Sequence, residues 1–129
     1  MNVFQIKNLH LTLSSFIIIG VGLIYGVFPS KTIPYFFNFN VDSIELYNIF
    51  RATMSLYIGI SIYWIIGVIK TNHWKNATLL NVVFMGSLAF GRIASLLIDG
   101  FSIPFSKGLL LEFLFCIWGL INLYKYKTN

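Results

Sequence analysis

The sequence predicts an all-α integral membrane protein, an up-down-up-down bundle of four helices. Of its 129 residues, 57% are hydrophobic and only 10% are charged, whereas soluble domains carry about 25% charged residues. Four apolar segments reach the length of about 20 residues that a membrane-spanning helix needs. The breaks between these segments contain proline, glycine or clustered polar residues, which are typical of helix ends. The length fits a single domain over residues 1–129.

The first two spans are predicted over residues 9–28 and 45–69. The first is expected to be a retained helix rather than a signal peptide, because its apolar run is long and no A-x-A cleavage site follows it. The break over residues 29–43 begins with a proline, contains a second proline and includes several aromatic residues. Aromatic residues at such a position indicate a short segment that lies in the membrane interface.

The other two spans are predicted over residues 75–98 and 106–124. The polar stretch KTNHWK separates the third span from the second. The stretch DGFSIPFSK, with its Asp-Gly pair and proline, separates the fourth span from the third. Because these connections are short, consecutive helices are expected to run antiparallel.

The distribution of basic residues predicts the orientation in the membrane. One side of the bundle carries five of them, Lys7, Lys70, Lys75, Lys125 and Lys127, and the other carries two, Lys31 and Lys107. Short cytoplasmic loops carry the excess of Lys and Arg. We therefore expect a multi-pass protein of the bacterial cytoplasmic (inner) membrane with both termini in the cytoplasm.

Small residues four positions apart occur in three of the spans. They form the patterns Gly22-x-x-x-Gly26, Ser55-x-x-x-Gly59 and Ser87-x-x-x-Gly91. Such patterns let helix backbones approach closely in membranes. They predict tight packing within the bundle, although any one of these faces could instead serve a homodimer.

Three charged residues are predicted to lie at one depth inside the membrane. With a rise of about 1.5 Å per residue, Arg51 lies about 12 Å, Arg92 about 10 Å and Glu112 about 9 Å below the outer boundary. An arginine at the centre of a spanning helix costs about 2.5–3.5 kcal/mol on insertion scales, so it should face the protein interior. We therefore expect Arg51 to face Glu112, Asp99 or water.

The helical period adds polar neighbours to this layer. Ser95 and Asp99 share a face with Arg92, and Tyr47 and Asn48 share a face with Arg51. Two arginines against one certain carboxylate leave a positive charge, and guanidinium groups bind carboxylate, phosphate or sulfate. The seven residues Arg51, Arg92, Glu112, Asp99, Asn48, Tyr47 and Ser95 thus form a candidate ligand-binding site.

Several functions remain open for this layer. The favoured hypothesis is an outward-facing pocket that binds or passes a small anionic or polar ligand or a lipid head group. The same residues could form a closed ion-pair network that fixes helix register, or a proton or ion relay. A further alternative is a non-catalytic accessory or assembly subunit of a larger membrane complex.

The sequence contains no motif for a metal site, a cofactor, a catalytic centre or nucleic-acid binding. Cys116 is the only cysteine, and His10 and His73 are expected at the inner boundary, without a second pair of ligands at metal spacing. No metal site, cofactor or catalytic residue is therefore predicted. The basic residues lie beside hydrophobic segments, as membrane anchors do, so we expect the lipid bilayer and not nucleic acid as the partner.

Three motifs in order resemble a known family. They are Phe50-Arg51-Ala52-x-x-Ser55-Leu56-Tyr57, Gly91-Arg92-x-x-Ser95-x-x-x-Asp99-Gly100, and Glu112 early in the last span. The chain resembles an uncharacterised family of small bacterial four-helix membrane proteins, a domain of unknown function. It is also distantly similar to the DoxX-like group, some members of which associate with quinone-linked oxidoreductases. The resemblance implies a four-helix membrane fold and no catalytic role.

Overall fold

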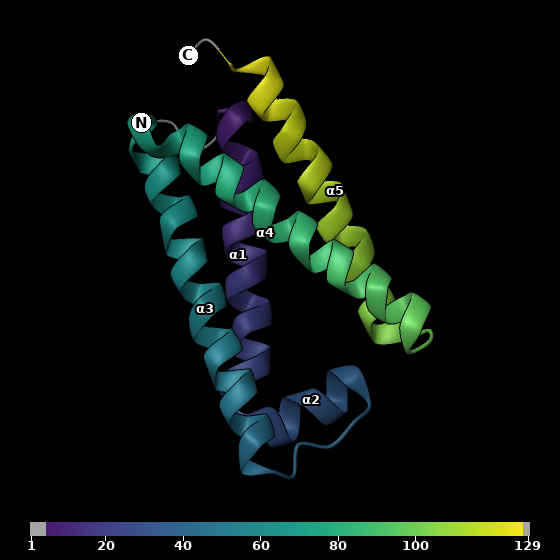
Figure 1. Cartoon of the computed structure of the whole chain (residues 1–129). Coiled ribbons are helices and arrows are strands. Elements are labelled where there is room, and N and C mark those ends of the chain that lie inside the picture. Colours follow the sequence, from purple (N-terminus) through teal and green to yellow (C-terminus); the bar gives the residue numbers. More distant parts are fainter. Residues whose placement is uncertain (1–4, 128–129) are drawn as a thin grey trace.

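The computed structural model of the chain, described here for residues 5–127, is built from helices connected by short segments (Figure 1). The helices are α1 (Ile6–Gly26), α2 (Pro29–Phe37), α3 (Ile44–Ile69), α4 (Thr71–Ile98) and α5 (Ile103–Lys125). No strand occurs among these residues. The four long helices have the length and hydropathy to cross a membrane. The predicted all-α fold, with four helices that could span a membrane, is confirmed. That the chain forms one domain stays a prediction.

The helices begin earlier than the sequence analysis expected. The clearest difference is α4, which starts at Thr71, so that Lys70 alone separates it from α3. The polar residues there predict a loop, but polarity alone does not break a helix. The prolines predict helix ends, yet two of them lie in first turns: Pro29 in α2 and Pro104 in α5. Proline fits there because the first amides of a helix have no intrahelical acceptor.

The predicted interfacial break contains the short helix α2. The single hydroxyl hydrogen of its Thr32 is shared between the carbonyl oxygens of Ile24 and Phe28, and the bond to Ile24 ties α2 to the end of α1. Asn38 ends α2 in the left-handed conformation, with φ 63°. Ser43 then begins α3 as its N-cap, because its hydroxyl accepts a hydrogen bond from the Leu46 amide at 3.2 Å.

The long helices associate as two pairs. α1 packs mainly against α3, and α4 mainly against α5. The pairs meet at one end, here called the junction end, where α3 joins α4, α1 begins and α5 ends (Figure 1). The side chains of Trp74 and Asn122 both donate hydrogen bonds to the carbonyl oxygen of Lys7 and hold this end together. Towards the opposite end, called the α2 end, the pairs diverge (Figure 1).

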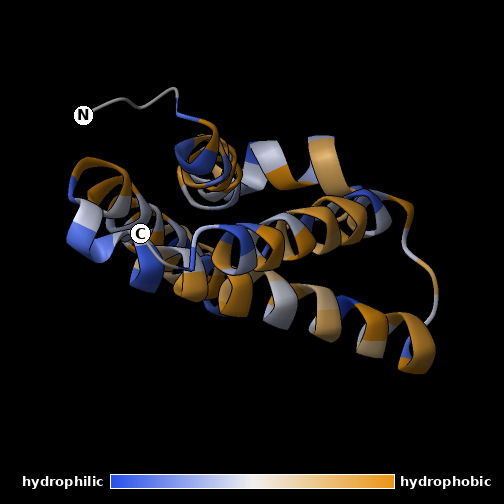
Figure 2. Ribbon diagram, turned by 90° about the horizontal axis from the view of Figure 1, so that it is seen from above, coloured by the Kyte–Doolittle hydropathy of each residue, from blue (hydrophilic) through white to orange (hydrophobic). Residues whose placement is uncertain are grey.

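The outer faces of the bundle are hydrophobic. Figure 2 shows hydrophobic residues along the long helices, with hydrophilic residues gathered mainly towards their ends. Large apolar side chains such as Phe16 (71% exposed) and Phe90 (74%) point outward. Contiguous apolar surface of this kind is rare on soluble monomers. The fold therefore fits a small multi-pass membrane protein.

Only one of the three predicted small-residue patterns packs against another helix within the chain. Gly22 and Gly26 of α1 lie against Met54 of α3, and a Cβ at Gly22 would lie 3.2 Å from the Cβ of Tyr57. Gly59 and Gly91, by contrast, would carry a Cβ with no neighbour within 4 Å. Their patterns were therefore wrongly interpreted as contacts inside the bundle. Gly59 lies on an exposed face of α3, and Gly91 lies beside a cavity.

Candidate functional site

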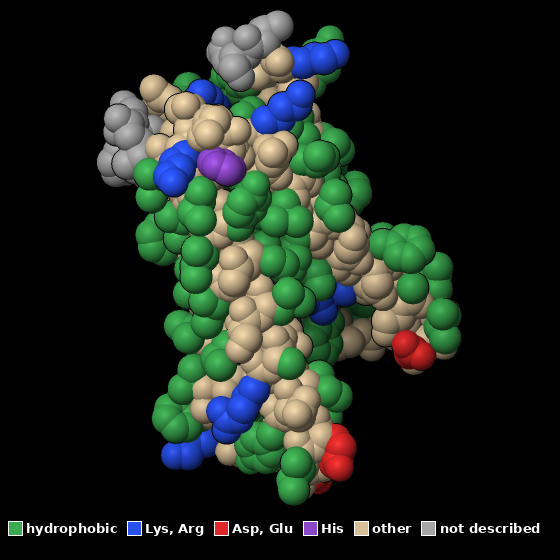
Figure 3. Space-filling model, turned by 60° about the vertical axis from the view of Figure 1, so that its left-hand side comes forward, with side chains coloured by type: hydrophobic (Ala, Val, Ile, Leu, Met, Phe, Trp, Pro, Cys, Tyr) green, Lys and Arg blue, Asp and Glu red, His purple; other side chains and the backbone are tan. Residues whose placement is uncertain are grey.

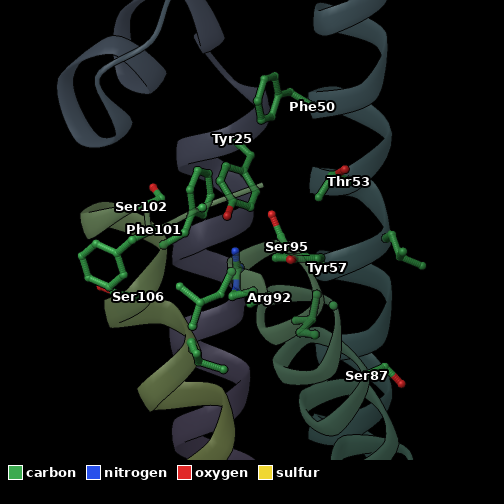
Figure 4. Close-up of a pocket in the computed structure, with 17 residues that line it drawn as sticks. Tyr25, Phe50, Thr53, Tyr57, Ser87, Arg92, Ser95, Phe101, Ser102 and Ser106 are labelled. Carbon is green, nitrogen blue, oxygen red and sulfur yellow. The ribbon is translucent and has the colours of Figure 1, made fainter. Parts of the chain in front are cut away.

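A cavity of about 630 Å³ lies where the two helix pairs diverge. Four helices contribute to its wall: α1 with Tyr25, α3 with Phe50 and Tyr57, α4 with Arg92, and α5 with Phe105. Figure 3 shows the molecule hollowed between the two pairs, and Figure 4 shows the aromatic rings and hydroxyl groups around the cavity. Its size lies within the range of about 300–1,000 Å³ that is usual for ligand pockets.

The charged centre of the cavity is an ion pair between α4 and α5. The Nε of Arg92 donates to both carboxylate oxygens of Glu112, at 2.9 and 2.8 Å. The side chains are 20% and 6% exposed, respectively. Gly108 lies beside the guanidinium, where a Cβ would be in ordinary van der Waals contact with the same Nε, at 3.5 Å. Within residues 5–127 this is the single ion pair.

A second cavity of about 180 Å³ shares part of its wall with the first. Arg92, Tyr25, Tyr57 and Phe105 line both cavities, whereas Glu112 lines only the smaller one. The Arg92 side chain therefore borders both the larger cavity and the smaller one that its carboxylate partner lines.

Arg92 has donors left over for a ligand. A guanidinium has five N–H groups, and the contacts with Glu112 use only the one on Nε. The hydroxyl groups of Tyr25 and Tyr57 point towards the guanidinium (Figure 4), and the Phe105 ring centre lies 5.2 Å from its Cζ. Hydrogen-bond donors in an apolar, aromatic wall can bind and orient an oxygen-bearing molecule.

Arg51 does not join this centre, and its predicted contact with Glu112 or Asp99 is wrong. Its Nη1 donates to the carbonyl oxygen of Gly26 at 2.9 Å, and its Cζ lies 5.8 Å from the Tyr47 ring centre. Gly26 is the last residue of α1, and the last carbonyls of a helix have no intrahelical partner. Arg51 therefore satisfies a helix end rather than a buried carboxylate.

The face of α3 that reaches the cavity also differs from the predicted one. Phe50, Thr53 and Tyr57 line the cavity, while Tyr47 and Asn48 line neither cavity. Successive helical residues are separated by about 100°, so Arg51 lies about 100° away from Phe50 around α3. The interpretation chose the polar stripe of α3, but the aromatic stripe faces inward.

The residues predicted on α4 do lie together. Ser95 lines the cavity, and its hydroxyl donates to Oδ2 of Asp99 at 2.8 Å. Asp99 is exposed next to Gly100, which turns the chain with φ +111° and lines the mouth. The structure thus brings Arg92, Glu112, Ser95 and Asp99 to one region; their role in ligand binding stays a prediction.

Two tyrosines that line this site were not among the residues predicted from the sequence. Tyr25 and Tyr57 are 6% and 5% exposed, and their ring centres lie 5.7 Å apart. Tyr25 also contacts Phe37 and Phe50, at 5.5 and 5.7 Å between ring centres. The available signal was a tyrosine inside an apolar span, because a buried phenol needs a polar neighbour for its hydroxyl.

A second polar region lies nearer the junction end. His10, which was expected near the inner boundary, lies close to the start of α1 and is fully buried, and its Nε2 donates to the carbonyl oxygen of Phe115 at 2.9 Å. Its ring packs edge-on against Trp118, with 5.4 Å between ring centres. Asn81 is also fully buried, and no atom of residues 5–127 bonds its amide group. No cluster that could hold a metal ion is found in the same range.

Comparison with family descriptions matches residues 6–123 to the family described as Domain of unknown function (DUF4345). The matched range begins with α1 and ends within α5. Neither the curated proteins nor the solved structures gave a match.

Proposed function

The chain belongs to the DUF4345 family, a domain of unknown function, as its motifs predicted, and from its geometry we propose that it binds a small polar ligand in a membrane-embedded cavity. Arg92 is the binding group, Glu112 holds it in place, and the hydroxyl groups of Tyr25 and Tyr57 complete the polar lining. The distant similarity to the DoxX-like group stays a prediction.

The observation that carries this proposal is the position of Arg92. Its Nε is held by both oxygens of Glu112, yet the same side chain lines a cavity of about 630 Å³. A closed ion-pair network would need no cavity beside it. Ionisable groups within membrane spans commonly mark ligand or ion pathways, and this one is oriented by its partner, as a binding group needs to be.

The ligand class is narrower than the two predicted arginines suggested. With Arg51 bound to the end of α1, the site holds one cation and one anion. An anionic ligand would leave an excess negative charge in surroundings of low dielectric constant, which is costly. We therefore favour an uncharged or weakly charged ligand with oxygen acceptors over a strongly anionic one.

We propose that the cavity mouth faces outward from the bacterial inner membrane. Lys7, Lys70, Lys75 and Lys125 lie at the junction end, where α1 begins and α5 ends. This end is expected in the cytoplasm by the excess of basic residues. The α2 end, with the mouth near Gly100 and Ser102, then faces the opposite side.

The alternative role is that of a subunit in a larger assembly or a homodimer. Ser55 and Gly59 of α3 form an exposed small-residue face, and a Cβ at Gly59 would meet nothing within 4 Å. Another helix could approach closely there. Purification in mild detergent separates the roles: stoichiometric partner proteins would support the subunit, and a lone protein with a bound small molecule would support the pocket. An enzymatic role is not proposed, because both Glu112 oxygens are engaged by Arg92.

Native mass spectrometry of protein released from nanodiscs tests the pocket. We expect a small-molecule adduct on the natural chain that is lost when Arg92 and Glu112 are both replaced by leucine. The double replacement is chosen because Arg92→Leu alone would leave a buried, unpaired carboxylate. Arg51→Leu, which changes an arginine outside the cavity, is the matched control and should keep the adduct. An adduct that survives the double replacement would refute the site.

A further inference from the structure

Resting on that proposed function, we infer that the ligand is an uncharged amphiphile that enters from the bilayer, with an oxygen-bearing head at Arg92 and an apolar chain directed to an opening between α3 and α4. Three observations carry this inference: the place of the opening along the helices, the chemistry of the cavity wall and the charge balance at Arg92.

The cavity reaches the surface in the middle of two spanning helices. Leu56 of α3 and Ser87 of α4 both line it and are both exposed, Leu56 to 57%. Leu56 lies 12 residues after the start of α3 and Ser87 lies 11 before the end of α4, which places each about 16–18 Å from the α2 end. The hydrocarbon core is about 30 Å thick, so the opening lies near the membrane midplane and faces lipid.

Aromatic contacts close the gap between α3 and α4 on the junction side of this opening. The ring of Phe84 packs edge-on against Tyr57 and Trp64, at 5.3 and 5.4 Å between ring centres. Beyond Phe84, one stripe of α4 in the cavity wall carries the small residues Ser87, Gly91 and Ser95, next to the larger side chains of Leu88, Arg92 and Leu96. Space remains beside Gly91, where a Cβ would meet no atom within 4 Å. A chain can therefore lie along α4 between the opening and Arg92.

The polar and apolar parts of the cavity are ordered by depth. Arg92 lies six residues before the end of α4, about 9 Å from the α2 end, while Leu56 and Ser87 lie deeper. An amphiphile in the adjoining leaflet has the same order, with its head near the surface and its chain towards the midplane. It could enter sideways without turning over.

The charge balance selects the head group. Glu112 already neutralises Arg92, and the polar groups near it in the cavity include the remaining guanidinium N–H groups and the hydroxyls of Tyr25, Tyr57 and Ser95. These groups donate hydrogen bonds to a carbonyl, ester or hydroxyl oxygen without requiring a charge on it. A phosphate or carboxylate head would instead compete with Glu112 for Arg92.

Photolabelling in nanodiscs tests the inference with a long-chain alcohol that carries a diazirine at the end of its chain. We expect the label on peptides that contain Leu56 and Ser87. At the same total concentration, unlabelled long-chain alcohol should compete, whereas a short-chain alcohol should compete at least about tenfold less, because each methylene that moves from water into the bilayer and the cavity favours the longer chain by about fourfold. Gly91→Trp fills the path and should lower labelling about fivefold or more; Gly59→Trp, at an equally open glycine outside the cavity, should not.

The outcomes separate this inference from the proposed function. Equal competition by the short-chain alcohol, with labelling abolished by the Arg92→Leu/Glu112→Leu variant, would overturn the amphiphile and keep the polar pocket. Stronger competition by a long-chain alkyl phosphate would overturn the uncharged head group. Labelling that neither Gly91→Trp nor the double leucine variant changes would refute both proposals. Should Gly91→Trp fail to fold, Ser87→Trp obstructs the same opening from an exposed position.

Discussion

At the scale of single residues, Arg92 and Glu112 are expected to stabilise the fold only as a pair. Removing one partner of a buried ion pair costs about 3–5 kcal/mol, because the other charge is left buried and uncompensated. We therefore predict that Arg92→Leu and Glu112→Leu each lower thermal stability in detergent, while the double variant regains most of the loss. Because the double variant should lose less than either single variant, the coupling in a double-mutant cycle should exceed about 3 kcal/mol.

Arg51 supplies the matched control for this cycle. It bonds the Gly26 carbonyl and lies outside the cavity. Arg51→Leu and Glu112→Leu should therefore destabilise additively, to within about 0.5 kcal/mol. Strong coupling of Arg51 to Glu112 would instead restore the predicted pairing and contradict the arrangement found here.

Asn81 is expected to lower the thermal stability of the protein relative to an apolar residue at the same buried position. Its side chain is fully buried, and its amide finds no bonding atom among residues 5–127. A buried polar group without a partner costs about 1–3 kcal/mol. We predict that Asn81→Leu raises the melting temperature in detergent, measured by intrinsic fluorescence. A lower melting temperature would show that the amide is bonded in the membrane protein and is needed there.

Four of the seven predicted site residues lie together in the structure, for physical reasons that can be stated. Arg92, Glu112, Ser95 and Asp99 were found because charged and polar groups in an apolar span must turn inward or towards the mouth. The predicted pairing of Arg51 with a carboxylate was wrong because Arg51 instead bonds the free carbonyl of Gly26, which is 25 positions away in the sequence. Tyr25 and Tyr57 were missed because an aromatic residue in an apolar span resembles core packing until its neighbours are known.

At the scale of helices, α1 and α3 pack together through buried glycines, which tolerate substitution less well than exposed glycines do. A Cβ at Gly26 would clash with the side chain of Met54, whereas a Cβ at Gly59 would meet open space. We predict that Gly26→Ala destabilises the protein by about 1–3 kcal/mol through overpacking. Gly59→Ala should be neutral or stabilising by up to about 1 kcal/mol through helix propensity.

Thermal unfolding in one detergent compares these two variants directly. If Gly26→Ala were as stable as the natural chain, the close packing of α1 on α3 would be contradicted. If Gly59→Ala were strongly destabilised or lost a dimer band on native gels, its face would be an interface between chains, as the alternative function requires.

The existence of the four long helices followed from hydrophobicity, but their ends did not. Length and apolar content select a spanning helix whatever its exact boundary. The residues Thr71, Asn72 and His73 are polar and yet helical, because the end of a spanning helix extends into polar surroundings where such side chains are at no disadvantage. Local polarity therefore predicts where hydrocarbon ends, which is not where the helix ends.

At the scale of the whole molecule, the orientation in the membrane can be tested with introduced cysteines. In a Cys116→Ser background, Asp99→Cys lies at the exposed α2 end and Asn72→Cys at the exposed junction end. We expect a membrane-impermeant maleimide to label Asp99→Cys in intact cells and Asn72→Cys only after permeabilisation, because basic residues keep the junction end in the cytoplasm. The reverse pattern would invert the orientation and turn the cavity mouth inward.

The fold class could be read from composition, whereas the divergence of the two helix pairs could not. Hydrophobicity says that the helices lie in a membrane, and lipid is as apolar as a helix surface. Which helices touch is then decided by shape, as where Met54 rests on Gly22 and Gly26 or Phe84 meets Trp64. Those contacts join residues that are far apart in the sequence, and they produce no repeating pattern of residue types from which they could be predicted.

The single extended residue Lys70 between α3 and α4 has a mechanical consequence. Because Trp74 and Asn122 both bond Lys7 at the junction end, we expect a change in the width of the cavity to be a rotation about that end, which would separate the stacked rings of Phe37 and Phe105 at the α2 end. Each pair then acts as a lever arm of about 39 Å, the length of a 26-residue helix such as α3. A tilt of about 5° would move the far end of the helix by roughly 3 Å. This displacement is enough to admit or retain an alkyl chain while the junction end stays almost in place.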